Sequence, residues 1–128
     1  MRTAINAAII RRKRILLVRK KNTWILPGGK PNKGEHEVDC LFREMNEELP
    51  GLRLTITGYY SEFEGVTPHK GDVLEARVYF AEAVGNTSTT SHEILESARV
   101  SYENANAKYQ VSDITKKVLD GLRQSNYL

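Results

Sequence analysis

One segment constrains the fold of this chain more than any other, a glycine-containing loop that leads into an acidic helix. Pro27-Gly28-Gly29 ends the apolar run Trp24-Ile25-Leu26, because proline lacks an N–H and glycine adds backbone freedom that weakens a strand. From about His36, apolar residues recur at helical intervals until Pro50-Gly51 interrupts them. They are Val38, Leu41, Phe42, Met45 and Leu49. The sequence predicts a loop to about Gly34 and then a helix of about fourteen residues that buries this stripe.

The predicted helix has a second face that is anionic. At 3.6 residues per turn, Glu44, Glu47 and Glu48 share one face, Glu37 joins it two turns earlier, and the apolar stripe lies roughly 115° away. Like charges at this spacing oppose helix formation by roughly 0.2–0.5 kcal/mol per pair, and Arg43 is the only nearby residue whose positive charge offsets this repulsion. A solvated surface is the alternative interpretation. We expect a divalent cation here, and an all-oxygen ligand set favours Mg²⁺ or Mn²⁺ over zinc.

Length and composition exclude several classes of protein. A chain of 128 residues with 40% hydrophobic and 27% charged residues is expected to form one globular domain over 1–128. Cys40 is the only cysteine, which excludes an intrachain disulfide, and no apolar run approaches the roughly 20 residues of a membrane helix. We therefore expect a cytoplasmic protein without a membrane partner. A net charge of +3 does not by itself indicate a nucleic-acid partner, and both a monomer and a homodimer stay open.

The remaining elements mix strands and helices, so the predicted fold class is α/β (α+β). Apolar runs over 4–10 and 15–18 predict a hairpin with a basic tip, and alternating residues predict strands over 52–57, extended by 59–63, and over 74–80. The segment 91–100 is ambiguous between a helical turn and a short strand. Ser112 is a candidate cap for a final helix. The buried stripe of that helix would be Ile114, Val118, Leu119 and Leu122.

The spacing of glycine, glutamates and arginine resembles the Nudix box of the MutT-like Nudix hydrolase family, whose pattern is G-x5-E-x7-R-E-U-x-E-E-x-G-U, with U a bulky aliphatic residue. The matching residues are Gly29, Glu35, Arg43, Glu44, Met45, Glu47 and Glu48. The box covers residues 29–52. Pro50 stands where the pattern has glycine, and Gly51 comes one place late, as if one residue had been inserted. This departure follows the last glutamate, so it concerns the helix exit rather than the carboxylates.

The resemblance implies an α/β/α sandwich around a central mixed β-sheet. It also implies hydrolysis of a nucleoside diphosphate linked to another group, either a nucleoside triphosphate or a nucleotide sugar such as ADP-ribose. By the same resemblance, Glu44, Glu47 and Glu48 would ligate Mg²⁺ or Mn²⁺ together with the backbone carbonyl of Gly28. Arg43 would pair with Glu35 and hold the loop against the helix.

The catalytic base and the substrate contacts are less narrowly defined. The family places the base either in the box, at a residue such as Glu44 or Glu47, or in a later loop, where Glu93 is the first candidate. Glu82 and Glu96 follow it, and an ordinary surface acid is the alternative for Glu93.

Candidate substrate contacts come from three parts of the chain. Arg77 and Tyr79 project from the strand face opposite the apolar stripe, where they would meet phosphate or base or form a surface pair. Arg19 and Lys30 flank the approach to the glycine loop and are candidate phosphate contacts. Pro68 lies sixteen residues beyond Leu52, a spacing similar to that of ADP-ribose-cleaving members.

Two other functions fit the same sequence. The fold also serves as a non-catalytic nucleotide-binding sensor, although such sensors usually lose box glutamates, and here the glutamates are intact. Removal of pyrophosphate from RNA 5′ ends is the second alternative, which the basic hairpin permits and which strong salt dependence of binding would support. A small nucleotide remains the leading substrate.

Overall fold

The computed structural model describes residues 2–67 and 70–128, so Pro68 lies outside the described residues. The elements are β1 (Arg2–Arg11), β2 (Arg14–Lys20), β3 (Thr23–Ile25), β4 (Gly28–Gly29), α1 (Glu37–Glu48), β5 (Leu52–Val66), β6 (Val73–Gly85), β7 (Ile94–Ser101), α2 (Tyr102–Lys108) and α3 (Asp113–Gln124). Within the described residues, no helix has the length and apolar character needed to cross a bilayer.

The strands form a mixed sheet in which β1 is the shared element. The order is β3-β2-β1-β6-β5, with β4 also paired to β1 and β7 to β2. β1 runs parallel to β6, with Ala4 opposite Ala76, whereas the other strand pairs are antiparallel. The predicted hairpin is confirmed, and its two-residue tip places Arg12 and Lys13 at φ values of 52° and 62°.

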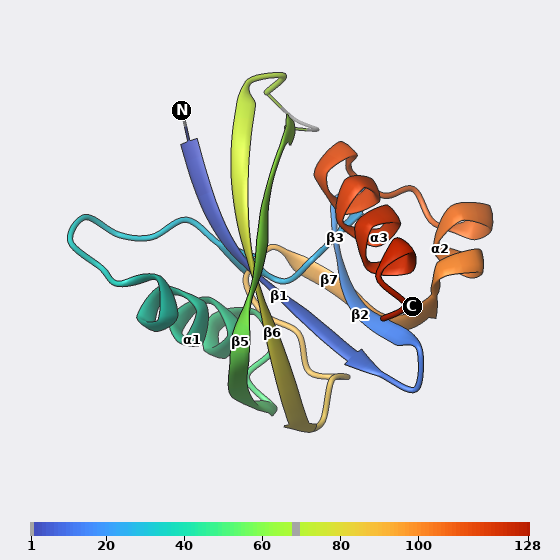
Figure 1. Ribbon diagram of the computed structural model, residues 1–128. Helices are drawn as coiled ribbons and strands as arrows, with labels where there is room; N and C mark the ends of the chain where they lie inside the picture. The colour runs from blue at the N-terminus through green and yellow to red at the C-terminus, as the bar shows by residue number, and fades with distance from the viewer. Residues whose placement is uncertain (1, 68–69) are drawn as a thin grey trace.

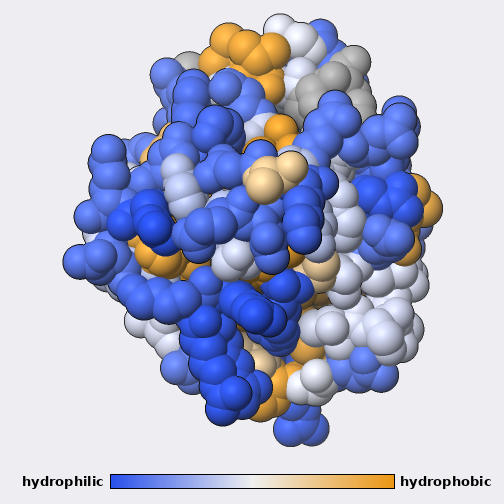
Figure 2. Space-filling view, turned by 90° about the vertical axis from the view of Figure 1, so that its right-hand side faces the viewer, coloured by the Kyte–Doolittle hydropathy of each residue, from blue (hydrophilic) through white to orange (hydrophobic). Residues whose placement is uncertain are grey.

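Helices cover both faces of this sheet, which confirms the predicted α/β/α sandwich. α1 lies on one side and α2 and α3 lie on the other (Figure 1). Because successive strand residues point to opposite faces, Leu17 packs in the core beneath α3 and Leu16 packs in the core beneath α1. The outer surface of the side that carries α2 and α3 is mainly hydrophilic, with small scattered apolar patches (Figure 2).

The local predictions near the chain end are largely confirmed. Ser112 caps α3, and its side chain accepts a hydrogen bond from the Thr115 N–H. The ambiguous segment 91–100 supplies β7, a strand that pairs with β2. α2 was not predicted from the sequence; its Ser101 cap and short length leave little apolar periodicity. After α1 the chain turns at once, with the Leu52 N–H donating to the Leu49 carbonyl at 3.0 Å, and Pro50-Gly51 lies within this turn.

The prediction of which side of α1 is buried needs correction. Val38 and Phe42 were expected in the core, but they are 40% and 42% exposed, whereas Cys40 is fully buried. The helix is turned toward the glycine loop, whose Gly29 carbonyl contacts the Cys40 sulfur at 3.6 Å. The same orientation buries Glu48, which is 9% exposed. The packing of the loop on α1, rather than apolar periodicity alone, therefore sets the buried face.

Cys40 is fully buried, so we expect its thiol to react slowly in the folded protein. Burial is also the main reason that the pKa of this thiol rises to about 11, with Glu35 adding to the effect. At pH 8 only about one such thiol in a thousand is ionised. We expect iodoacetamide to alkylate Cys40 slowly in native protein and rapidly in denaturant, measured by intact mass. Equal rates in the two states would contradict the buried position.

Candidate active site

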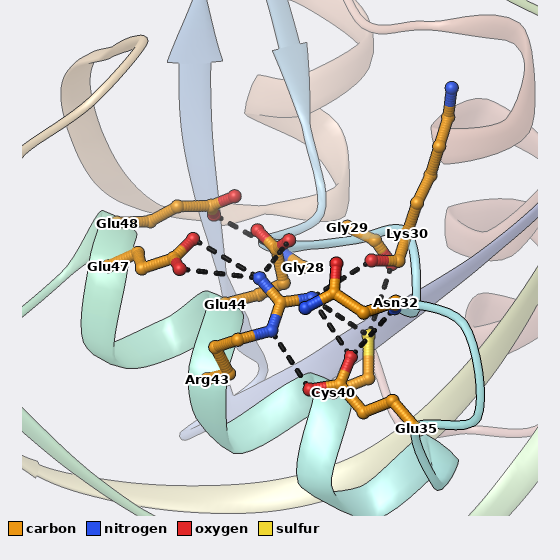
Figure 3. Close-up of polar contacts among 10 residues, drawn as sticks. All are labelled: Gly28, Gly29, Lys30, Asn32, Glu35, Cys40, Arg43, Glu44, Glu47 and Glu48. Carbon is orange, nitrogen blue, oxygen red and sulfur yellow. Dashed lines mark hydrogen bonds and ion pairs between the residues drawn. The ribbon is translucent and has the colours of Figure 1, made fainter.

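The glutamates of α1 meet the glycines of β4 at one place (Figure 3). The Gly28 N–H donates to the Oε1 of Glu48 at 3.3 Å. A Cβ atom added to Gly29 would lie 2.6 Å from both carboxylate oxygens of Glu44, closer than real side chains approach. The absence of a side chain at Gly29 therefore lets the backbone lie directly against the Glu44 carboxylate, while Gly28 contacts Glu48 through its N–H.

Arg43 holds the loop and the helix together. Its Nε donates to Glu35 at 2.9 Å, and its Nη2 donates to Glu35 and to the Lys30 carbonyl, each at 3.0 Å. The pairing of Arg43 with Glu35 that the resemblance implied is confirmed. The hydrogen bonds from Arg43 are the main reason that the pKa of Glu35 lies below its usual range. The other edge of the guanidinium donates from Nη1 to Glu44 at 3.0 Å and to Glu47 at 3.3 Å.

Glu48 is the electrostatically strained member of the site. Its burial raises the pKa of the carboxyl well above the usual range, and the nearby Glu44 raises it further, while the Gly28 N–H opposes the shift. Taking a carboxylate out of water and placing it beside a second carboxylate costs free energy unless a cation compensates. The pair of Glu44 and Glu48 therefore has the properties of an anionic site that needs a positive partner.

The residues present fit a hard divalent cation. Their potential ligand atoms are carboxylate and backbone oxygens, which Mg²⁺ and Mn²⁺ prefer. Within the described part of the chain, no three acidic, histidine or cysteine side chains converge as a ready metal site. Arg43 instead bridges Glu44 and Glu47, so its guanidinium supplies the positive charge between these two carboxylates. Glu48 lies beside this bridge and needs further compensation.

A cavity of about 620 Å³ opens beside this site. Glu44, Glu47 and Glu48 form its acidic end. Its basic lining residues are Arg2, Lys20, Lys21, Lys30 and Lys70. Glu93 also lines it and forms an ion pair with Lys20, with 2.6 Å between the Lys20 Nζ and the carboxylate. Lys20 is close enough to the Glu48 carboxyl to lower its pKa, so the cavity has a cationic side chain near the anionic cluster, which suits a phosphate group bridged to a metal ion.

The rest of the cavity wall is apolar and comes from the sheet and α3. Its apolar side chains are Ala4, Ile25, Leu26, Val66, Leu74, Ala76, Ile94 and Ile114. A pocket with an apolar part and a few polar groups is typical of small-molecule sites. Asn6 and Thr23 also line it, and neither was predicted from the sequence. A polar side chain inside the apolar run 4–10 was the available signal for Asn6.

The structure brings some of the predicted substrate contacts to the cavity and leaves others away from it. Lys30 and Glu93 line the cavity, whereas Arg19, Arg77 and Tyr79 are absent from its described lining. Arg77 forms an ion pair with Glu37 at 2.8 Å, and the Tyr79 hydroxyl donates to the same carboxylate at 2.6 Å.

These contacts show how two of the residues are held. Glu37, expected on the face of Glu44 and Glu48, pairs through its carboxylate with Arg77 and Tyr79 of β6. Arg19 hydrogen bonds to Glu96 at 3.1 Å and to the Lys21 carbonyl at 2.8 Å, so its guanidinium is already occupied. We therefore leave Arg19, Arg77 and Tyr79 out of the substrate site.

Comparison with known proteins gives one family and many similar structures. A family model described as NUDIX domain matches residues 1–122. No curated protein sequence matches the chain significantly. Among solved structures, the chain is similar to a MutT NUDIX hydrolase from Burkholderia pseudomallei, with 25% identity, a TM-score of 0.79 and coverage of 93% of this chain and 95% of that one.

Two further similar structures broaden the comparison. A MutT protein from Methanosarcina mazei Go1 has 20% identity and a TM-score of 0.83, with 99% of this chain and 96% of that chain covered. An ADP-ribose pyrophosphatase from Streptococcus suis has 20% identity and a TM-score of 0.72, with 95% and 87% covered. At these identities the structures support the fold, and the family model carries the assignment.

Proposed function

Because this chain belongs to the NUDIX domain family of hydrolases that act on pyrophosphate bonds, we propose that it cleaves a nucleoside diphosphate linked to another group, using Mg²⁺ or Mn²⁺. The substrate would be a nucleoside triphosphate or a nucleotide sugar such as ADP-ribose. The observation that carries the proposal is the buried Glu48 carboxylate beside Glu44, at the acidic end of a cavity with basic and apolar walls. The acidic end suits a metal ion, the basic wall suits phosphate groups, and the apolar wall suits a nucleoside.

Each side chain at the acidic end has a distinct proposed role. Glu44, Glu47 and Glu48 would hold the cation together with the Gly28 carbonyl. A bound cation supplies Lewis acidity toward phosphate oxygens and the attacking water. Arg43 already contacts Glu44 and Glu47, so it would orient both carboxylates and keep the loop closed through Glu35.

The proton acceptor and the phosphate contacts would come from the acidic end and the basic wall. Either a box glutamate or Glu93 would take the proton from the attacking water. Glu93 lines the cavity and is held by Lys20, which supports its candidacy. Lys30 would contact the phosphates from the start of the loop, since it lines the same cavity.

A product-resolved assay tests the proposal. The purified protein would be incubated with Mg²⁺ or Mn²⁺ and a panel of nucleoside triphosphates, nucleotide sugars, dinucleoside polyphosphates and capped or triphosphorylated RNA. We expect a nucleoside monophosphate plus either pyrophosphate or a phosphorylated second group. Binding of nucleotides without turnover would indicate a sensor, and products from RNA alone would indicate RNA 5′-end processing. No product with either metal would contradict the proposed activity.

Gly29→Ala is expected to reduce activity without unfolding the protein. The new Cβ would collide with the end of the flexible Glu44 side chain, so the carboxylate has to move while the backbone does not. Because small misplacements of catalytic groups are costly, we expect kcat/KM to fall about 10- to 100-fold. The thermal unfolding midpoint should change little. Gly58→Ala is the matched control, since nothing lies within 4 Å of its added Cβ. Wild-type activity of Gly29→Ala would refute the assigned place of Glu44.

A further inference from the structure

Every buried polar side chain of the described residues lies at the cavity. Thr23, Glu48, Ser112 and Thr115 are the polar or charged residues exposed by 9% or less, and all of them line it. Burying a polar group costs free energy unless it finds a hydrogen-bond partner. Glu48 belongs to the acidic end already described. The three hydroxyl groups therefore each need a partner, either in the protein or in a ligand.

Ser112 and Thr115 provide partners for each other. The Ser112 Oγ donates to the Thr115 Oγ1 at 2.8 Å and accepts the Thr115 backbone N–H at 3.2 Å. This arrangement caps the first turn of α3, which satisfies one of the backbone N–H groups that a helix start leaves open. The burial of both residues is explained by the helix cap and requires no ligand.

The hydroxyl of Thr23 has no such explanation. Thr23 is 7% exposed, and its side chain makes no hydrogen bond to any described residue. No fully buried side-chain oxygen or nitrogen in the described ranges lacks a partner, so the Thr23 oxygen must be open to the cavity that this residue lines. A hydroxyl that is held in the wall of a cavity without a partner in the described ranges is available to a bound molecule.

Asn6 presents a second polar group to the same cavity. It pairs with Val78 in the parallel ladder, on the sheet face that packs beneath α3. Its Nδ2 donates to the carbonyls of Leu26 and Pro27 at 3.2 and 3.4 Å. These two acceptors fix the orientation of the amide, which leaves the Oδ1 as an acceptor without a described partner. A ligand that bonds to Asn6 therefore has to supply a donor.

On the sheet next to Asn6, the cavity is lined by small apolar side chains. Ala4 and Ala76 face each other across β1 and β6, and both line the cavity. Ile114 lines it from α3. Two adjacent methyl side chains leave room above the sheet for a flat ring, whose polar edge would then reach toward Asn6 and Thr23. A heterocycle with N–H groups at its edge has the shape and the donors that this wall accommodates.

We infer that Thr23 and Asn6 are specificity-determining residues that select the nucleobase of the substrate by hydrogen bonds to its edge. This inference rests on the proposed function, because it concerns the nucleoside end of the same cavity. Asn6 requires an N–H donor on the base, and Thr23 either donates or accepts. A base that satisfies both groups binds better than one that leaves either unpaired, since an unpaired buried group is costly.

Thr23→Val tests the inference, because valine has nearly the shape of threonine but no hydroxyl. Steady-state kinetics with ATP, GTP, CTP and UTP should show kcat/KM for the preferred base falling roughly 3- to 10-fold. The least preferred base should change little, so the selectivity ratio shrinks. Thr23→Ser keeps the hydroxyl and should restore the ratio. Thr55→Val, at an exposed position of β5, is the matched control and should keep the wild-type ratio.

Thermal unfolding separates a recognition role from a structural one. Without nucleotide, Thr23→Val should unfold at the wild-type temperature or above, because a methyl replaces a hydroxyl that has no partner among the described residues. An unchanged selectivity ratio, a failure of serine to restore it, or a lower unfolding temperature would overturn the inference. If the wild-type protein cleaves no nucleotide of any class, the proposed function itself fails, and this inference falls with it before any variant is compared.

Discussion

Glu48→Gln is expected to lower kcat roughly 10²- to 10³-fold while leaving the protein folded. Glutamine keeps the size of the side chain and an oxygen that accepts the Gly28 N–H. It removes the charge that would hold the cation. Because Glu48 is 9% exposed and lies beside Glu44, loss of its charge also removes an unfavourable buried interaction. The metal-free variant should therefore be at least as stable as the metal-free wild type.

Two measurements on the same variant separate metal binding from folding. Mg²⁺ should raise the unfolding temperature of the wild-type protein, because a ligand that binds only the native state stabilises it, and this rise should be lost in Glu48→Gln. Glu64→Gln removes an exposed glutamate of β5 and serves as the charge control. Wild-type turnover and wild-type stabilisation by Mg²⁺ in Glu48→Gln would show that this carboxylate is not part of the metal site.

Gly28→Ala is expected to damage both stability and activity. Gly28 has a φ of +138°, and an added Cβ would overlap the Ile5 carbonyl and lie 2.8 Å from the Cα of Asn6. These are backbone atoms of β1, so the pairing of β4 with β1 has to shift. We expect a loss of about 3 kcal/mol in the free energy of unfolding, or roughly 10 °C in the unfolding midpoint.

The two glycines of β4 therefore make a matched pair. Gly28→Ala should lower both the unfolding midpoint in calorimetry and kcat/KM, whereas Gly29→Ala should lower kcat/KM alone. Gly58→Ala again controls for the loss of a glycine, since its added Cβ meets nothing. A Gly28→Ala protein with wild-type stability would contradict the close approach of β4 to β1.

The fold was largely predictable because its signals are local. Apolar runs identified the strands of the hairpin, alternating residues identified those of 52–57 and 74–80, and helical spacing identified α1 and α3. The Ser112 cap was predicted because serine, a residue type that often caps helices, precedes an apolar stripe of helical spacing. β7 stayed ambiguous because its strand conformation depends on pairing with β2, a partner more than seventy residues earlier in the chain. The apolar and polar residues of 94–101 alternate only weakly, so the local pattern alone does not distinguish a strand from a helical turn there.

The candidate site was predictable in part. The glutamates, Gly28 and the pair of Arg43 and Glu35 follow from a motif with fixed spacing, and the structure places them together. The substrate contacts do not follow from such a motif. Arg77 and Tyr79 had a suitable chemistry and strand face, but the face they share is covered by α1 and holds Glu37. Which element covers a strand face cannot be obtained from the strand itself.

The chemical groups of the candidate site could be predicted from the sequence alone, because spacing along one helix and one loop places carboxylates, arginine and glycine in a fixed local arrangement. Their environment could not, since it depends on tertiary packing. This packing turned α1 so that Glu48 rather than Val38 and Phe42 is buried, and it brought Asn6 of β1 and Thr23 of β3 to one cavity. Which side chains are buried, and which side chains they contact, depends on how distant strands and helices pack. That packing is a property of the whole sheet rather than of any single segment.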